Sequence, residues 1–154
     1  MKRRAVIAAL ALVAVVAPAA MAQVSRPAGG SDYTPRLGDL MNMVQTRHIK
    51  LWFAAKNSSW DLAAYELAQI KAGLSDAAGM YSGLPVNNLT TMSDPLDALA
   101  AAIKAKDGKK FAASFGTLTT GCNACHQTME RSFVVIQQPP TSPFSNQSFA
   151  PARK

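Results

Sequence analysis

Apolar side chains recur every three or four residues along most of the chain, which is the spacing of one face of an α-helix. The first run extends from Leu37 to Ala55 and is interrupted by the polar triplet at 57–59. A second run extends from Trp60 to Gly79, and Ser58 with Asp61 resembles an N-cap pair that starts it. The pattern therefore predicts two amphipathic helices joined by a short polar turn.

Turn-forming residues separate these helices from a second pair. Residues 81–92, with two glycine or proline positions and two adjacent asparagines, are predicted to form a loop. Ser93 is expected to cap a short third helix that has Pro95 in its first turn and ends at 107–108. A fourth helix is predicted over 109–137. Four amphipathic helices with short connections predict an all-α fold, an antiparallel up-down-up-down four-helix bundle, whose core commonly holds a cofactor.

Both ends of the chain depart from the helical pattern. Residues 1–22 combine a basic start, an apolar stretch and an Ala-Met-Ala site, which is typical of a secretory signal peptide cleaved after Ala22. The alternative is a retained membrane anchor, but the apolar run is shorter than the roughly 20 residues that a spanning helix needs. Residues 23–34 are expected to be a flexible segment before the folded domain at 35–137. The Pro-rich tail, 138–154, is either disordered or folded back over the bundle through its two phenylalanines.

The only two cysteines of the chain lie inside the predicted fourth helix, in the sequence Cys122-Asn123-Ala124-Cys125-His126. This C-x-x-C-H spacing is the attachment signature of c-type haem. Residues three and four apart share a helix face, so both thiols can reach one porphyrin edge while His126 donates an imidazole nitrogen to the iron. We therefore expect one covalent haem c, with thioether bonds to Cys122 and Cys125 and with His126 as the proximal iron ligand.

Two other uses of these cysteines fit the pattern less well. A redox-active C-x-x-C pair is typical of strand-rich surroundings and a helix that starts at the first cysteine, whereas this pair lies well inside a predicted helix. Two cysteines and two histidines also lack the spacing of a zinc finger. Gly116 and Gly121 on the same helix are expected to permit close approach of the haem or of a neighbouring helix.

Four predicted helices with C-x-x-C-H inside the last one resemble the class II cytochromes c, the group of cytochrome c-prime and the low-spin cytochrome c-556. The resemblance covers roughly residues 35–133, and only the haem motif within it is specific. It implies a distal iron ligand on the first helix and makes a homodimer plausible. The long tail and Glu130-Arg131 depart from the group, whose members often continue with an aromatic and a basic residue.

Two residues on the inner face of the first helix, Met41 and His48, are candidates for the distal ligand. In an up-down-up-down bundle, the turns near Asn57 and Gly108 lie at the same end. At about 1.5 Å per residue, His126 lies about 27 Å from that end, Met41 about 24 Å and His48 about 14 Å. We therefore predict Met41 as the distal ligand. His48 is the alternative, and an open or water-filled position is the third possibility.

The formal net charge is +7, and removal of the three basic residues of the signal peptide leaves +4. The basic residues are scattered, so nucleic-acid binding is not expected, whereas a mildly positive surface suits an acidic redox partner. Arg36, Arg47 and Arg131 are candidates to pair with haem propionates, although a solvated surface charge is the simpler interpretation for each.

Haem with His/Met ligation gives low-spin iron with a raised reduction potential. The sequence therefore predicts a periplasmic carrier of single electrons between redox partner proteins. If Met41 only fills the core, the alternative is a five-coordinate protein of the cytochrome c-prime type that binds or senses NO or CO. A redox subunit or interaction module docked through the Pro-rich tail is a third possibility. No Ser/His/Asp arrangement, carboxylate pair or phosphate loop indicates an enzyme.

Overall fold

The computed structural model describes residues 34–84 and 86–152. The predicted signal peptide, 1–22, and all of the predicted flexible segment except Thr34 lie outside these residues. Both therefore stay predictions.

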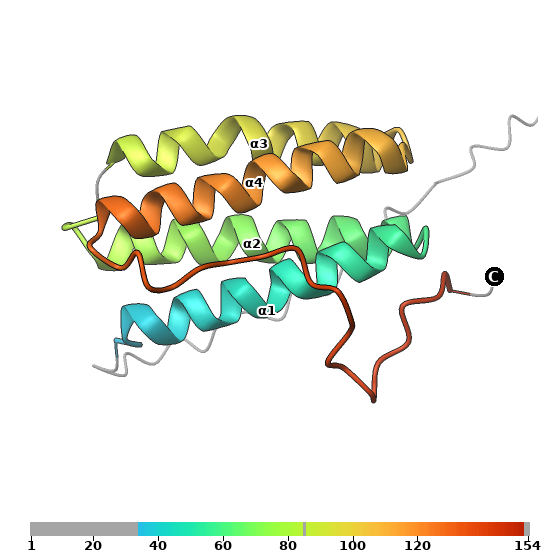
Figure 1. The fold of residues 1–154 in the computed structure, drawn as a ribbon, viewed down its shortest axis with the longest axis horizontal. Helices are drawn as coiled ribbons and strands as arrows, with labels where there is room; N and C mark the ends of the chain where they lie inside the picture. The colour runs from blue at the N-terminus through green and yellow to red at the C-terminus, as the bar shows by residue number, and fades with distance from the viewer. Residues whose placement is uncertain (1–33, 85, 153–154) are drawn as a thin grey trace, which may run out of the picture. The chain divides into compact units, whose positions relative to one another are not determined.

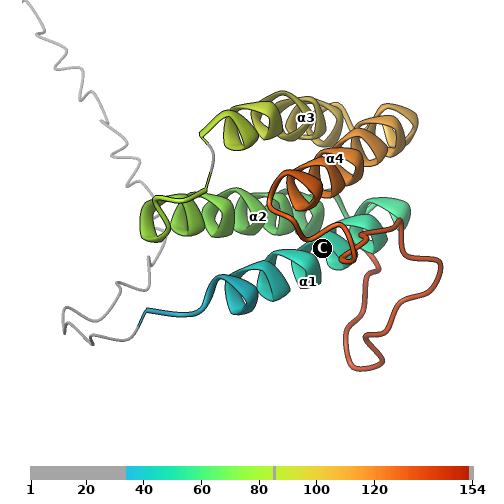
Figure 2. The ribbon, with the colours of Figure 1, turned by 60° about the vertical axis from the view of Figure 1, so that its left-hand side comes forward.

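Four α-helices form the regular structure of the described residues, in which there are no strands: α1 (Leu37–Lys56), α2 (Trp60–Met80), α3 (Val86–Lys104) and α4 (Gly108–Thr128) (Figure 1). Consecutive helices pack against one another, whereas contacts between α1 and α4 are sparse. Figure 2 shows α1 beside α2 and α3 beside α4. The all-α fold class is thus confirmed, and the arrangement is compatible with a four-helix bundle.

One apolar core runs between the helices. The face of α1 that the periodicity marks as internal is directed into it: Val44, Leu51 and Ala55 are buried, and Met41 packs against the core from its edge. The largest fully buried apolar side chains come from all four helices: Leu51, Ile70, Leu99, Phe115 and Leu118. None of the described helices is long and apolar enough to cross a membrane.

Three of the helices are followed, two residues after their last helical residue, by a non-glycine residue in the left-handed conformation: Ser58, Lys106 and Glu130, with φ of 58°, 54° and 57°. After each helix, two N–H groups bond back to carbonyls of its last turn, as Arg131 N–H does to the His126 carbonyl at 2.7 Å. This is the Schellman pattern, in which glycine is the usual left-handed residue. The prediction that Ser58 caps α2 is therefore wrong, because Ser58 closes α1.

The start of α3 also differs from prediction. The helix begins at Val86, so of the loop predicted over 81–92 only the described residues 81–84 lie outside a helix, and Ser93 and Pro95 lie inside the helix instead of at its start. The reason is tertiary packing, which outweighs the local turn signals. The apolar face of α3 continues on both sides of the proline, through Met92, Leu96, Leu99 and Ile103, all of which are buried.

The fourth helix is shorter than predicted. Asp107 caps its start by accepting a hydrogen bond from the Lys110 N–H at 2.9 Å, which also lowers the pKa of the Asp107 carboxyl. The helix ends at Thr128 and not at 137, because the Schellman turn at Glu130 reverses the chain. Figure 1 shows the following segment running back along the helices.

Of the two alternatives for the tail, the structure shows the folded-back one for residues 138–152. Phe149 is only 8% exposed and belongs to the apolar core. Its ring lies 5.8 Å, centroid to centroid, from that of Phe53 on α1 and 6.3 Å from that of Phe144. The Nζ of Lys50 lies 4.8 Å from the Phe144 ring centroid, a cation–π arrangement.

Candidate cofactor site

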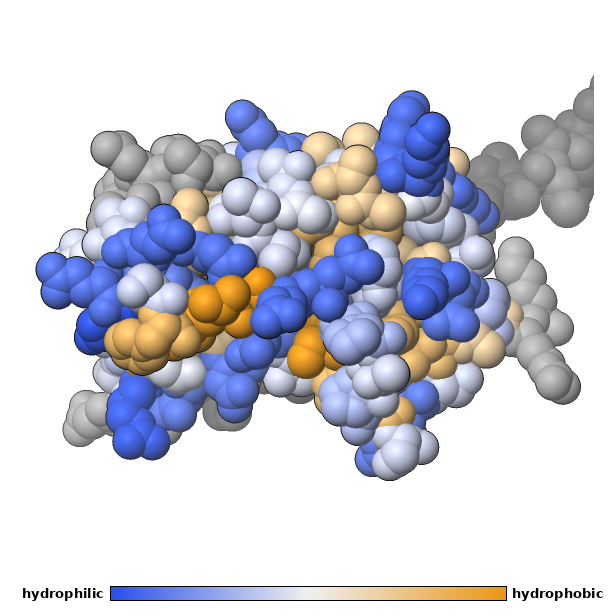
Figure 3. All heavy atoms as spheres, viewed as in Figure 1, coloured by the Kyte–Doolittle hydropathy of each residue, from blue (hydrophilic) through white to orange (hydrophobic). Residues whose placement is uncertain are grey.

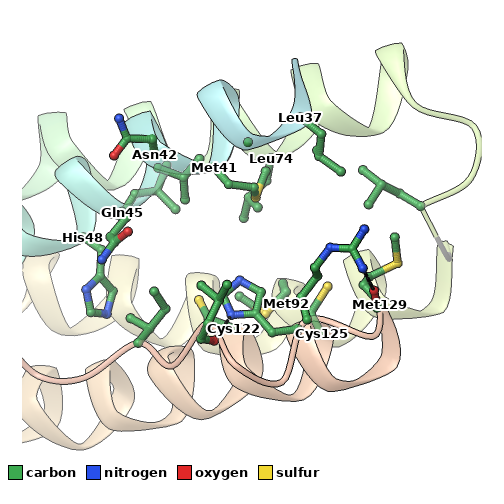
Figure 4. Close-up of a pocket in the computed structure, with 18 of the residues that line it drawn as sticks. Leu37, Met41, Asn42, Gln45, His48, Leu74, Met92, Cys122, Cys125 and Met129 are labelled. Atoms are coloured by element: carbon green, nitrogen blue, oxygen red, sulfur yellow. Dashed lines mark hydrogen bonds between the residues drawn. The ribbon is translucent and has the colours of Figure 1, made fainter. Parts of the chain in front are cut away.

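A cavity of about 470 Å³ lies between α1 and the C-terminal part of α4, where contacts between these two helices are few. This volume is within the range of small-molecule and cofactor sites. Figure 4 shows Met41 and Leu74 on one side of the open space and Cys122, Cys125 and Met129 on the other. Most of the lining is apolar and includes Leu37, Met41, Val44, Ile70, Leu74 and Leu118.

All four residues predicted to hold the haem line this cavity. Cys122, Cys125 and His126 come from the last turns of α4, and Met41 comes from α1 across the cavity. Because α4 is helical through Thr128, the two thiols and the imidazole lie on one side of it, as the spacing predicted. The donor set, two thiols, an imidazole and a thioether around an apolar cavity, fits the chemistry of covalent haem.

The His126 imidazole is held by the chain that returns after α4. Its Nδ1 lies 2.7 Å from the carbonyl oxygen of Val134. A carbonyl can only accept a hydrogen bond, so the proton of the neutral ring is on Nδ1 and the lone pair is on Nε2. Metal-ligating histidines are oriented in this way, with the second ring nitrogen donating to a backbone carbonyl. Sequence reasoning missed this contact, because it extended the helix through Val134.

We call residues 129–136 the return strap. Asn123, between the two cysteines, holds its far end: the Asn123 Nδ2 donates to the Ile136 carbonyl at 2.9 Å, and the Ile136 N–H donates to the Asn123 Oδ1 at 2.7 Å. Val134 and Ile136 both line the cavity. The side chain of Ile136 is buried, whereas those of Phe133, Val134 and Val135 are exposed. Figure 3 shows apolar surface between strongly polar side chains on the face seen in Figure 1.

The surroundings of Cys122 differ from those of a reactive thiol. Burial, and secondarily the charge of a Cys125 thiolate, raises the pKa of Cys122 to about 11. Redox-active C-x-x-C pairs lie instead in electropositive, partly exposed surroundings that lower the thiol pKa. In the part of the chain that the structure describes, no group of three or more His, Cys, Asp or Glu is placed to hold a metal ion. The surroundings of Cys122 thus do not favour disulfide exchange.

His48 also lines the cavity, but it is buried at a different level along the helices from His126. Its Nε2 lies 2.9 Å from the Thr119 Oγ1, and that hydroxyl donates to the Phe115 carbonyl at 2.9 Å. The hydroxyl therefore accepts from His48 Nε2–H, and the His48 Nδ1 is left without a hydrogen-bond partner among the described residues. Thr119 precedes His126 by two helical turns, about 10 Å, which is close to the offset of about 13 Å expected from the sequence.

Met92 is a cavity residue that sequence reasoning assigned to a loop. It is 4% exposed, and Figure 4 shows it beside Cys122, on the α4 side of the cavity. A Cβ added at Gly121 would lie 2.7 Å from the Met92 Sδ, so Gly121 permits close approach of α3, as predicted. At Gly116 no neighbouring helix approaches in this way, because no atom of another described element lies within 4 Å of a Cβ added there.

Only one of the three candidate arginines lies at the cavity. Arg131 is among its lining residues. Arg36 pairs with Asp39 at 3.1 Å on the surface. Arg47 pairs at 3.1 Å with Glu66, whose side chain is 2% exposed. The arrangement therefore leaves Arg131 as the candidate to pair with an acidic group of a ligand in the cavity.

No protein-family model, no curated protein and no solved structure gives a significant match to the chain.

Proposed function

We propose that this protein is a periplasmic c-type cytochrome that carries single electrons, built as an antiparallel up-down-up-down four-helix bundle. Cys122 and Cys125 would hold one haem c through thioether bonds, with His126 and Met41 as the iron ligands. The observation that carries the proposal is that all four side chains line one apolar cavity in which the His126 Nδ1 already donates to the Val134 carbonyl. The bound haem would supply the one-electron redox chemistry.

The residues of the chain have separate tasks in this proposal. The Val134 carbonyl keeps the His126 lone pair on Nε2, available to a metal. The apolar walls contributed by Ile70 and Leu118 exclude water from the site, and a drier site favours the less charged, reduced state of a redox centre. The contact of His48 with Thr119 supports Met41 over His48 as the distal ligand, because it keeps that imidazole about two turns away from the level of His126.

The test of the carrier function is the absorption spectrum of the purified protein in its oxidised and reduced forms. We expect haem that stays attached after denaturation, and a low-spin spectrum with a methionine-to-iron charge-transfer band. Met41→Ala should lose that band and bind CO readily. Met43→Ala is the matched control, because Met43 is on the same helix but is 56% exposed, and its spectrum should equal that of the unmodified protein.

Two outcomes would contradict parts of this proposal. A low-spin spectrum that persists in Met41→Ala but is lost in His48→Ala would show that His48 is the distal ligand. A high-spin spectrum with ready CO binding in the unmodified protein would exclude the carrier. It would favour the second candidate, a gas-binding or sensing protein of the cytochrome c-prime type, which the packing of Met41 against the apolar core supports.

A further inference from the structure

The return strap is fixed at both of its ends. At its start, the Schellman turn of α4 joins the Arg131 N–H to the His126 carbonyl at 2.7 Å. At its far end, the side-chain amide of Asn123 makes two hydrogen bonds, of 2.9 and 2.7 Å, with the backbone of Ile136. Between these two points the chain has little freedom, so the position of the Val134 carbonyl depends on both of them.

The two attachments differ in what a substitution can remove. The Schellman turn is made by backbone groups, whereas the far attachment depends on one side chain. Asn123 suits this contact because its amide offers a donor and an acceptor side by side, which match the C=O and N–H of one residue. The side chains at 133–135 are exposed. Without the amide, the segment would be held near His126 only by the bond from the Val134 N–H to the Arg131 carbonyl at 2.8 Å and by the buried side chain of Ile136.

We propose that Asn123 is a positioning residue for the proximal imidazole: by holding the return strap at Ile136, it keeps the Val134 carbonyl on His126 Nδ1 and thereby tunes the haem iron. The inference rests on the proposed function. A hydrogen bond from Nδ1 makes the imidazole a stronger donor to a metal. A stronger donor favours the oxidised iron, so the intact contact lowers the reduction potential.

Asn123→Ala tests this inference in the haem-loaded protein through two measurements. The first is the rate of exchange of the His126 Nδ1–H with solvent, followed by NMR in the reduced state. We expect it to rise about tenfold, the factor that corresponds to the loss of one ordinary hydrogen bond. The second is the midpoint potential, which should rise by the equivalent of an about tenfold change in the ratio of oxidised to reduced protein, about 59 mV for one electron.

Gln127→Ala is the matched control, because Gln127 is an exposed residue one turn further along α4, and both quantities should keep their original values in it. If Asn123→Ala cannot be isolated in folded form, Asn123→Gln moves the amide by one methylene and should shift both quantities in the same direction. Unchanged exchange and potential in a folded, haem-loaded Asn123 variant would overturn the inference alone. An unmodified chain without covalent haem would overturn the proposed function as well.

Discussion

At the scale of single residues, His48 gives the protein a defined response to acid. Burial lowers the pKa of His48 from its ordinary value of 6.5 to about 4. Between these two values the unfolded chain binds a proton that the folded chain does not, so the free energy of unfolding falls as the pH falls. The contribution of His48 to the free energy of unfolding is complete above about pH 6.5 and is lost by about pH 4. It amounts to roughly 3 kcal/mol, at about 1.4 kcal/mol per pH unit.

Denaturant unfolding at several pH values between 7 and 4 measures this response. His48→Gln keeps a polar side chain that does not titrate, so its free energy of unfolding should fall less steeply over that range. Carboxyl groups that titrate toward pH 4 affect both proteins equally, and the difference between the two curves isolates His48. Parallel curves would show that the imidazole is not the responsible group.

The sequence was most informative about the positions of single chemically important side chains. The positions of Cys122, Cys125 and His126 on one side of a helix follow from their spacing alone, and periodicity placed Met41 and His48 on the inner face of α1, where both line the cavity. The partners of these residues were not predictable. Val134 and Ile136 meet His126 and Asn123 only because the chain reverses at Glu130, and no short-range pattern indicates that reversal.

At the scale of helices, periodicity identified the elements but not all of their ends. The turn between α1 and α2 was predicted because three polar residues interrupt the apolar spacing. The end of α4 was missed for two physical reasons. Phe133 and Ile136 keep the helical spacing although they follow the helix, and the left-handed residue is Glu130, where glycine would have marked a stop.

Close packing of α1 on α2 depends on Gly73. A Cβ at this position would lie 2.8 Å from the Val44 Cγ2, and a valine side chain has little rotamer freedom in a helix with which to move away. Gly73→Ala should therefore lower the free energy of unfolding by about 1–2 kcal/mol. This is an overpacking cost of about 1–3 kcal/mol, reduced by the gain of up to about 1 kcal/mol in helix propensity.

The control for Gly73 is Gly79 on the same helix, where no described atom lies within 4 Å of an added Cβ. Gly79→Ala should leave the free energy of unfolding unchanged or raise it by up to about 1 kcal/mol. Denaturant unfolding of both variants separates the overpacking cost at Gly73 from the gain in helix propensity. A Gly73→Ala protein as stable as Gly79→Ala would show that α1 and α2 can move apart without loss.

At the scale of the whole molecule, the all-α class followed from the sequence but the course of the tail did not. Four prolines after residue 138 exclude a helix, and they leave open where an extended chain lies. Its position is set by ring contacts between residues far apart in the sequence, such as Phe149 with Phe53. Neither periodicity nor composition carries information about such contacts.

Phe149 should make the tail part of the cooperative fold. Removing its buried ring with Phe149→Ala should lower the free energy of unfolding by about 3 kcal/mol, at the lower end of the range for buried phenylalanines because the tail can partly relax. Phe133→Ala is the matched control, because that ring is 78% exposed and its loss should cost less than about 0.5 kcal/mol. Limited proteolysis after residue 137 should accelerate in the first variant only. Equal stability and equal cleavage of the two variants would mean that the helices fold without the tail, and that its contact with α1 does not stabilise the molecule.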